Sequence, residues 1–265
     1  MRRLIASLLV VFALGAEPNN DFRFAIVGDR TGAAIKGIYE RIWRQIGEFQ
    51  PDFAINVGDT IEGGKDDRAE SEWRELRPIW SRYGFPFYFT PGNHDIWSER
   101  SLQIYEKETG HKSYYSFNFQ NAHFTILDNS RTLELGDDQL KFLEEDLMAN
   151  QDRSPKFIFF HKPYWIAFLK LGSGDFPLHQ MARKYGVGYI VSGHAHQFMR
   201  MTRDGIVYMA VGSSGGALKG EGFSQGHFHH HVRVVVKRTK VELAVKDLEG
   251  RTFQYEPLRG EKQER

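Results

Sequence analysis

The chain contains 265 residues, 41% of them hydrophobic and 26% charged, which excludes wholesale disorder and suits one large domain or two small ones. The 35 basic and 34 acidic residues give a formal net charge of +1. The chain therefore lacks the surplus of basic residues that would indicate a nucleic-acid-binding patch. Because cysteine is absent, disulfides and thiolate sites are excluded, and any metal ligands must be His, Asp, Glu or Asn.

The N-terminus has the pattern of a secretory signal peptide. Arg2 and Arg3 precede an apolar run at 4–14, which is followed by small residues. This run is too short to span a membrane comfortably. We expect residues 1–16 to be removed, leaving a periplasmic or secreted protein with no membrane attachment; an uncleaved anchor or a buried helix is the alternative.

Strand-like runs alternate with helical patterns through the first two thirds of the chain, and strands dominate after residue 200. In chain order, the sequence predicts a strand at 22–27, a helix at 35–49, a strand at 53–57, a helix at 68–83 disturbed by Pro78, a strand at 87–89, a hairpin at 114–127, a helix at 138–148 and strands at 156–160, 188–191, 206–211, 231–236 and 241–245. This alternation indicates one α/β domain over residues 20–258, followed by a charged, flexible tail at 259–265.

Five of the apolar runs end in residues that can bind metals. These residues are Asp29, Asp59, the Asn93-His94-Asp95 triplet, His161, and His194 with His196. In open α/β sheets, ligands bind beyond the carboxyl ends of the strands, so we expect these side chains to converge. A glycine precedes four of the five positions and allows close backbone approach. Carboxylate, amide and imidazole groups together are typical of a two-metal centre that clamps a phosphate.

Each of these residues also has an ordinary structural interpretation. Asp29 and Asp59 could cap turns, Asn93–Asp95 could be turn chemistry, and His161 could be a hydrogen-bonded core histidine. Five independent turns have no reason all to carry metal ligands, so the joint pattern favours a metal site. A run of histidines at 227–231 opens a predicted strand, whose alternation would split the rings between two faces, and there we favour a packing or surface role.

In order and composition, these motifs resemble those of the calcineurin-like metallophosphoesterases over about residues 22–215. The resemblance implies an α/β fold, a four-layer α/β/β/α sandwich of two mixed β-sheets. It implies two divalent or trivalent ions (Mn, Fe, Mg or Zn) and hydrolysis of a phosphomonoester or phosphodiester by a hydroxide held between them. The partner is then a small-molecule phosphoester. The alternative is a non-catalytic phosphate- or metal-binding protein on the same fold.

The resemblance also implies a role for each residue. The metal ligands are divided between two sites: Asp59 bridges both ions, Asn93, His161 and His194 complete one site, and Asp29 and His196 serve the other. His94 contacts the phosphate or protonates the leaving oxygen, and Asp95 orients His94. Arg30, beside Asp29, is either a charge clamp for the phosphate or a surface arginine.

One position departs from the family pattern. Thr31 stands where the first motif usually has a metal-binding His, and a neutral hydroxyl is a poor replacement for imidazole. The second site is therefore weak or empty, completed by another residue, or part of a binding module. Purple acid phosphatases also lack this His and use a Tyr three residues after the bridging Asp. The equivalent residue here is Glu62, which would favour Mn, Fe or Mg over Zn; the alternative is a solvated loop residue.

Overall fold

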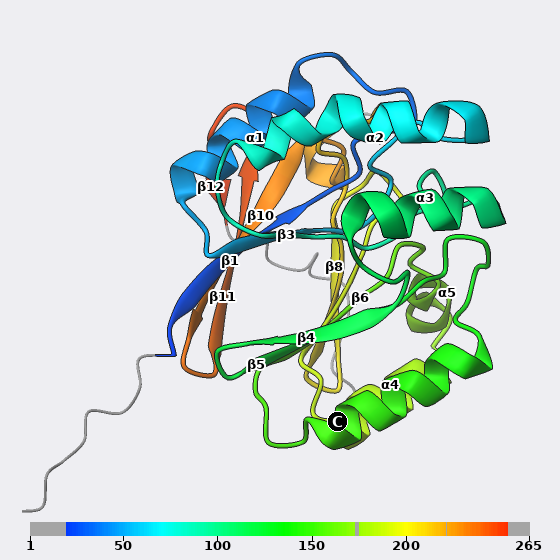
Figure 1. Ribbon diagram of the computed structural model, residues 1–265. Coiled ribbons are helices and arrows are strands. Elements are labelled where there is room, and N and C mark those ends of the chain that lie inside the picture. Colours follow the sequence, from blue (N-terminus) through cyan, green and yellow to red (C-terminus); the bar gives the residue numbers. More distant parts are fainter. Residues whose placement is uncertain (1–19, 173–174, 221, 254–265) are drawn as a thin grey trace, which may run out of the picture.

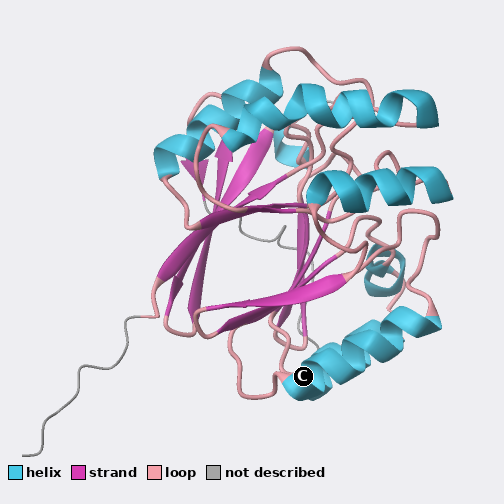
Figure 2. Ribbon diagram, in the orientation of Figure 1, coloured by secondary structure: helices cyan, strands magenta, loops and turns pink. Residues whose placement is uncertain are grey.

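Two six-stranded β-sheets lie face to face between two layers of helices, as Figures 1 and 2 show. The four-layer α/β/β/α sandwich implied by the motifs is therefore confirmed. This computed structural model describes residues 20–172, 175–220 and 222–253. The expected signal peptide (1–16) and tail (259–265) lie outside the described residues. Within the described ranges, no helix combines the length and the apolar character needed to cross a membrane.

The first sheet has the strand order β12-β11-β10-β1-β2-β3, with β1, β2 and β3 parallel. Its strands are β1 (Phe22–Val27), β2 (Phe53–Asn56), β3 (Phe87–Tyr88), β10 (His230–Lys237), β11 (Lys240–Asp247) and β12 (Thr252–Phe253). Its outer face is covered by α1 (Ile38–Phe49), α2 (Asp66–Ser81) and α3 (Glu99–Thr109). Burial of their apolar stripes, including Trp43 and Trp73, fixes these helices on the sheet.

The second sheet has the order β4-β5-β6-β7-β9-β8, in which β5, β6, β7 and β9 are parallel. Its strands are β4 (Tyr115–Phe119), β5 (Ala122–Ile126), β6 (Lys156–Phe159), β7 (Tyr189–Ser192), β8 (Met199–Arg203) and β9 (Ile206–Ala210). The helices α4 (Asp137–Ala149), α5 (Trp165–Lys170) and α6 (Pro177–Tyr185) pack on its outer face.

Phenylalanine rings fill the space between the two sheets. Phe24 stacks on Phe53 with ring centroids 4.9 Å apart, and Phe124 stacks on Phe157 at the same separation. Along β1, Phe24 and Ile26 face this inner core, while Ala25 faces the helices. Because the central strands are buried on both faces, they read in the sequence as continuous apolar runs. The loops that leave their carboxyl ends are held on this rigid frame.

Candidate metal centre

The loops after the parallel strands of both sheets bring four candidate ligands together. The Nε2 atom of His161 lies 3.1 Å from Oδ2 of Asp59, 3.2 Å from Oδ1 of Asn93 and 3.2 Å from Nδ1 of His194. Asp59 and His161 are buried, and His194 is half-buried. Ligand atoms of Asp59, His161 and His194 all lie within 4.8 Å of one another, a spacing that suits a shared cation. The expected convergence of these four residues is present.

The orientation of His161 is fixed from two sides. Its Nδ1–H donates to the Val57 carbonyl at 2.8 Å, so Nε2 is the nitrogen that faces the cluster. The Oδ1 atom of Asn129 accepts from the backbone N–H groups of His161 and Lys162, at 3.1 and 2.9 Å. Sequence reasoning missed Asn129, although it follows the apolar run of β5 just as the other site residues follow theirs.

Asp29 is fully buried, and neither of its carboxylate oxygens has a hydrogen-bond partner within 3.5 Å among the described residues, although the backbone N–H of His194 interacts with it weakly. The nearest cationic group is His161, whose Nδ1 lies 3.7 Å from Oδ1 of Asp29. Burial raises the pKa of Asp29 well above its usual value, with His161 opposing and the Asp59 charge adding to this rise. An unpaired buried carboxylate is costly unless a cation compensates it. This orphaned carboxylate and the convergent donors beside it fit a metal ion.

The charges around His161 set its protonation in the metal-free chain. Burial opposes protonation, but the carboxylates of Asp59 and Asp29 raise the pKa of His161 to about 9. Burial and the positive charge of His161 lower the pKa of His194 to about 4, so its imidazole is neutral. A cation that binds Nε2 of His161 therefore has to displace a proton. Metal affinity at this cluster should weaken as the pH falls.

The ligands expected for the second ion are less closely gathered. His196 is buried, and its Nδ1–H donates to the Ala217 carbonyl, which leaves Nε2 available as a ligand. Thr31 is buried, and its hydroxyl interacts with the Glu62 carboxylate; burial raises the pKa of Glu62, but this interaction and the Ala34 N–H lower it overall. Glu62 is half-buried, and its Oε1 accepts from the Ala34 backbone N–H at 3.0 Å. Glu62 thus reaches the loop that carries Thr31 but lies outside the convergent cluster.

The three residues expected to act on the substrate have defined contacts. The Nδ1–H of His94 donates to the Glu62 carbonyl at 2.6 Å, and its backbone N–H donates to Oδ1 of Asp59 at 2.9 Å. Arg30 reaches the Thr60 carbonyl with Nη1 at 3.4 Å. These contacts tie His94 and Arg30 to the Asp59 loop.

Asp95 differs from the expectation that it orients His94. Its carboxylate accepts from the backbone N–H groups of Thr60, Ile61 and Gly92, at 2.8, 3.2 and 2.9 Å. The partner of the His94 ring is the backbone carbonyl of Glu62, not the carboxylate of Asp95. Because Asp95 is fully buried and these three N–H groups satisfy its carboxylate, it joins the 92–95 loop to the 58–62 loop.

The sequence profile of the calcineurin-like phosphoesterases matches residues 22–198, most of the described chain. The chain belongs to this family. Among curated proteins, it is 25% identical over 195 residues to purple acid phosphatase 15 of Arabidopsis thaliana, which covers 67% of this chain. The chain spans only 33% of the length of that relative.

Three solved structures share the fold of this calcineurin-like phosphoesterase. The purple acid phosphatase PPD1 from yellow lupin seeds has a TM-score of 0.68 at 15% identity, over 88% of this chain and 52% of its own. GAP50, described as the anchor in the inner membrane complex of Plasmodium, has a TM-score of 0.66 at 14% identity and covers 90% of both chains. A dimetal phosphatase from Danio rerio has a TM-score of 0.61 at 14% identity, over 85% and 95%.

Glycines let the loops of this chain approach the candidate metal ligands closely. A Cβ on Gly92 would lie 2.2 Å from Oδ1 of Asp59, and one on Gly193 would lie 2.7 Å from Oδ1 of Asp29. Asp59, His194 and His196 also have positive φ angles, at 56°, 67° and 52°. Backbone strain of this kind gathers at functional sites, where the surrounding structure holds it in place.

The histidines at 227–231 stay apart from the ligand cluster. His230 and His231 are buried within the first sheet, and His230 accepts from the Gly212 backbone N–H at 3.2 Å. His229 bonds the Gly216 carbonyl at 3.0 Å. These contacts support the packing role that we expected from the alternation of side chains along the predicted strand.

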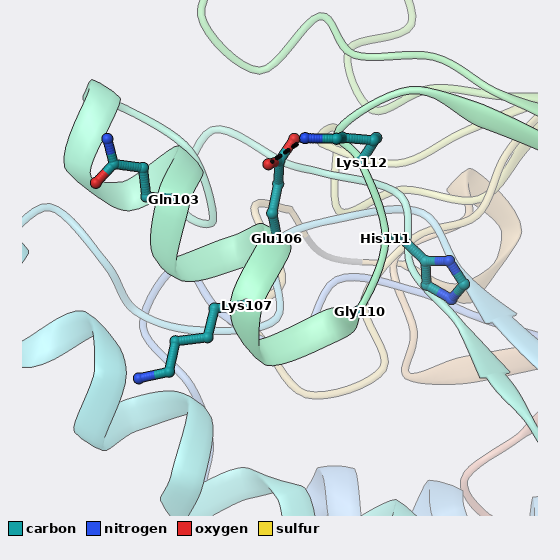
Figure 3. A pocket seen from close by; sticks show the side chains of 6 residues that line it. All are labelled: Gln103, Glu106, Lys107, Gly110, His111 and Lys112. Atoms are coloured by element: carbon teal, nitrogen blue, oxygen red, sulfur yellow. Dashed lines mark hydrogen bonds and ion pairs between the residues drawn. The ribbon is translucent and has the colours of Figure 1, made fainter.

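A surface hollow at the end of α3 also holds none of the candidate ligands. Figure 3 shows its lining residues, Gln103, Glu106, Lys107, Gly110, His111 and Lys112. Lys112 pairs with Glu106 at 2.9 Å, and Lys107 pairs with Glu70. Because both lysines are already paired with carboxylates, this hollow has no free charge that would recognise an anion.

Proposed function

We propose that this chain is a metal-dependent phosphoesterase that uses two metal ions to hydrolyse phosphomonoesters or phosphodiesters. One observation carries the proposal: Asp59, Asn93, His161 and His194 converge beside the buried, unpartnered carboxylate of Asp29. A structural interpretation explains hydrogen-bonded turns, but it does not explain a buried carboxylate with no partner. Membership of the calcineurin-like phosphoesterase family supports the same activity.

We infer two ligand sets, divided as the resemblance of the motifs implies; the convergent cluster supports the first set. Asn93, His161 and His194 would hold one ion together with Asp59, which also serves the second ion. Asp29 and His196 would hold the second ion, and Glu62 would supply the ligand that Thr31 lacks. Carboxylates in the second set favour Mn, Fe or Mg over Zn. When bound, two such cations supply Lewis-acid stabilisation of the phosphoryl group and a nucleophile derived from water.

The remaining residues position the substrate and move a proton. Since Nδ1–H of His94 donates to the Glu62 backbone carbonyl, Nε2 is the nitrogen that would give a proton to the leaving oxygen, from the imidazolium form of the ring. The bond from the His94 backbone to Asp59 keeps this ring in register with the ligand cluster. Arg30, tied to the same loop at Thr60, would provide a charge for the phosphate. Asp95 holds the two loops that carry Asp59 and His94 together.

The test is to load the purified chain with Mn²⁺, desalt it and measure bound metal per chain by elemental analysis. The same sample is assayed with p-nitrophenyl phosphate and with bis(p-nitrophenyl) phosphate, before and after treatment with a chelator. We expect about two ions per chain, as in other two-metal sites, and turnover that the chelator abolishes. One ion or none would overturn the dinuclear proposal. Two ions without turnover would favour the second candidate function.

That second candidate is a non-catalytic phosphate- or metal-binding protein on the same fold. Thr31 favours it, because a neutral hydroxyl stands where the family motif has a metal-binding imidazole. The fold is also shared with a Plasmodium protein described as an anchor. We rank this candidate second because His94 and the remaining metal-ligand residues of the motifs are present in the sequence. We further propose export, based on residues 1–16; mass spectrometry of the secreted N-terminus would test it.

A further inference from the structure

The segment that follows β9 forms one wall of the candidate site. The Ala217 backbone N–H donates to the Gly32 carbonyl at 3.2 Å, and the Ala217 carbonyl accepts from the His196 ring. The Ile35 backbone N–H donates to the Gly215 carbonyl at 2.8 Å. Residues 215–219 therefore connect the loop that carries Asp29 and Thr31 to the loop that carries His194 and His196.

Lys219 is the cationic side chain on this wall. It is exposed, and its Nζ donates one hydrogen bond, at 3.2 Å, to the backbone carbonyl of His194. An ammonium group has three donors, so this bond anchors the lysine beside the ligand cluster and leaves donors for a substrate. Burial, His161 and Asp59 shift the pKa of Asp29 and of His194 most, and the Lys219 charge makes a smaller contribution to both.

A comparison with Lys162 shows why Lys219 is the better candidate. Lys162 directly follows His161, but its Nζ donates to the carbonyls of Ser130 and Thr132, at 2.7 and 2.9 Å. Those bonds fix Lys162 against a neighbouring loop and use two of its three donors. Arg30, which makes one bond to the Thr60 carbonyl, is already assigned to the phosphate in the proposed function. Lys219 combines proximity to the cluster, exposure to solvent and unused donors.

We propose that Lys219 is a specificity-determining residue that binds a non-bridging phosphate oxygen and favours phosphomonoesters over phosphodiesters. This inference rests on the proposed function of the site. The phosphate of a monoester carries about 1.5 to 2 negative charges near neutral pH, because its second pKa is about 6. A diester carries one negative charge. An ammonium group at hydrogen-bonding distance stabilises the more highly charged phosphate more strongly.

The experiment compares wild type, Lys219→Gln and Lys219→Arg, with Lys240→Gln as the matched control. Lys240 is an exposed lysine at the start of β11, paired with Glu242 at 3.1 Å and outside the site. Each Mn²⁺-loaded protein is assayed for kcat/KM with p-nitrophenyl phosphate and bis(p-nitrophenyl) phosphate. The dissociation constant for orthophosphate is measured by calorimetry, and bound metal by elemental analysis.

We expect Lys219→Gln to lower the monoester-to-diester ratio of kcat/KM, and to weaken orthophosphate binding, by about 10-fold, as loss of one charge-assisted hydrogen bond predicts. The metal content should stay at the wild-type value, Lys219→Arg should recover most of both effects, and Lys240→Gln should match wild type. An unchanged ratio and phosphate affinity in Lys219→Gln would overturn the assignment while leaving the proposed function intact. Lys219-dependent phosphate binding without turnover would support the assignment and overturn the proposed catalysis.

Discussion

The Nε2 atom of His161 lies 3.1 Å from Oδ2 of Asp59, although the two residues follow strands of different sheets. Asp59 leaves β2 of the first sheet, and His161 leaves β6 of the second. The contact therefore exists only when the two sheets pack face to face. A cation held by this pair would bind the folded state and not the unfolded chain, so metal binding and folding are thermodynamically linked.

His94 separates catalysis from metal binding. We expect His94→Ala to lower turnover by about 10²- to 10⁴-fold, the usual contribution of a general acid, while the bound metal per chain is unchanged. The reason is that the His94 ring bonds the Glu62 carbonyl and contributes no atom to the convergent ligand cluster. The measurement is kcat with p-nitrophenyl phosphate together with elemental analysis. His111→Ala is the control, because that ring stacks on Tyr115, away from the ligands. Metal loss in His94→Ala would contradict this assignment.

A substitution of Glu62 tests whether this residue replaces the metal-binding histidine that the first motif lacks. We expect Glu62→Ala to bind one ion fewer than wild type, because the second set then keeps only Asp29 and His196 with the shared Asp59. Adding Thr31→His to this variant should restore the second ion. Glu72→Ala is the matched control: Glu72 holds the same loop by accepting from the Gly63 backbone N–H at 2.9 Å, but it lies on α2. If Glu62→Ala keeps the wild-type stoichiometry, Glu62 only supports the loop through Ala34.

Much of the fold and site could be predicted because the strands are buried on both faces and end abruptly. The prediction of a strand at 22–27 is confirmed by β1, and the predicted hairpin is confirmed by the antiparallel pairing of β4 with β5. At the strand ends, a glycine followed by a polar residue predicted Asp59 and His194 as site residues. Glycine is needed there because the backbone approaches its neighbours closely. The parallel direction of the strands brings the ligands of each sheet to one edge, and the packing of the two sheets then joins Asp59 to His161.

Other features depend on long-range contacts that leave little local signal. The helix α3 was not predicted, since its sequence is mainly polar and it buries only Ser101, Ile104 and Tyr105. The strand β8 was also missed, because as an edge strand it is only partly buried. The carboxylate of Asp95 selects backbone partners from a loop distant in sequence, which spacing cannot reveal. The side-chain position of Glu62 likewise depends on the packing of two loops.

Gly193 tests whether close approach at a strand end is required for the site. A Cβ there would lie 2.7 Å from Oδ1 of Asp29 and 2.7 Å from Cγ2 of Val57, both closer than real contacts allow. We expect Gly193→Ala to displace Asp29, lower metal affinity at least about 10-fold and reduce the free energy of unfolding by about 1–3 kcal/mol, as overpacking does. Gly188→Ala is the matched control, since a Cβ at Gly188 meets nothing within 4 Å. Calorimetric Mn²⁺ titration and urea unfolding of both variants measure these effects, and equal behaviour would contradict the steric argument.

His230 predicts an acid sensitivity that is separate from the metal ligands. Burial lowers its pKa to about 4, and its contacts require the neutral ring: Nδ1–H donates to the Phe228 carbonyl at 2.8 Å, and Nε2 accepts from the Gly212 backbone N–H. The unfolded chain, in which histidine has a pKa of about 6.5, therefore binds a proton that the folded chain does not bind between these two values. The stabilising contribution of this residue is complete above about pH 6.5 and is lost as the pH falls towards 4, by about 3 kcal/mol in total.

The variant that isolates this effect is His230→Gln, because the glutamine amide offers both donors and an acceptor but does not titrate. Urea unfolding of metal-free wild type and variant at several pH values between 7.5 and 4.5 gives the free energy of unfolding for each. We expect the wild-type value to fall more steeply below pH 6.5, by up to about 1.4 kcal/mol per pH unit, the limit for one proton. His231 is present in both proteins, but the charge of His230 contributes to lowering its pKa, so the difference reports His230 together with this interaction. Parallel curves would show that His230 does not control the acid stability of the first sheet.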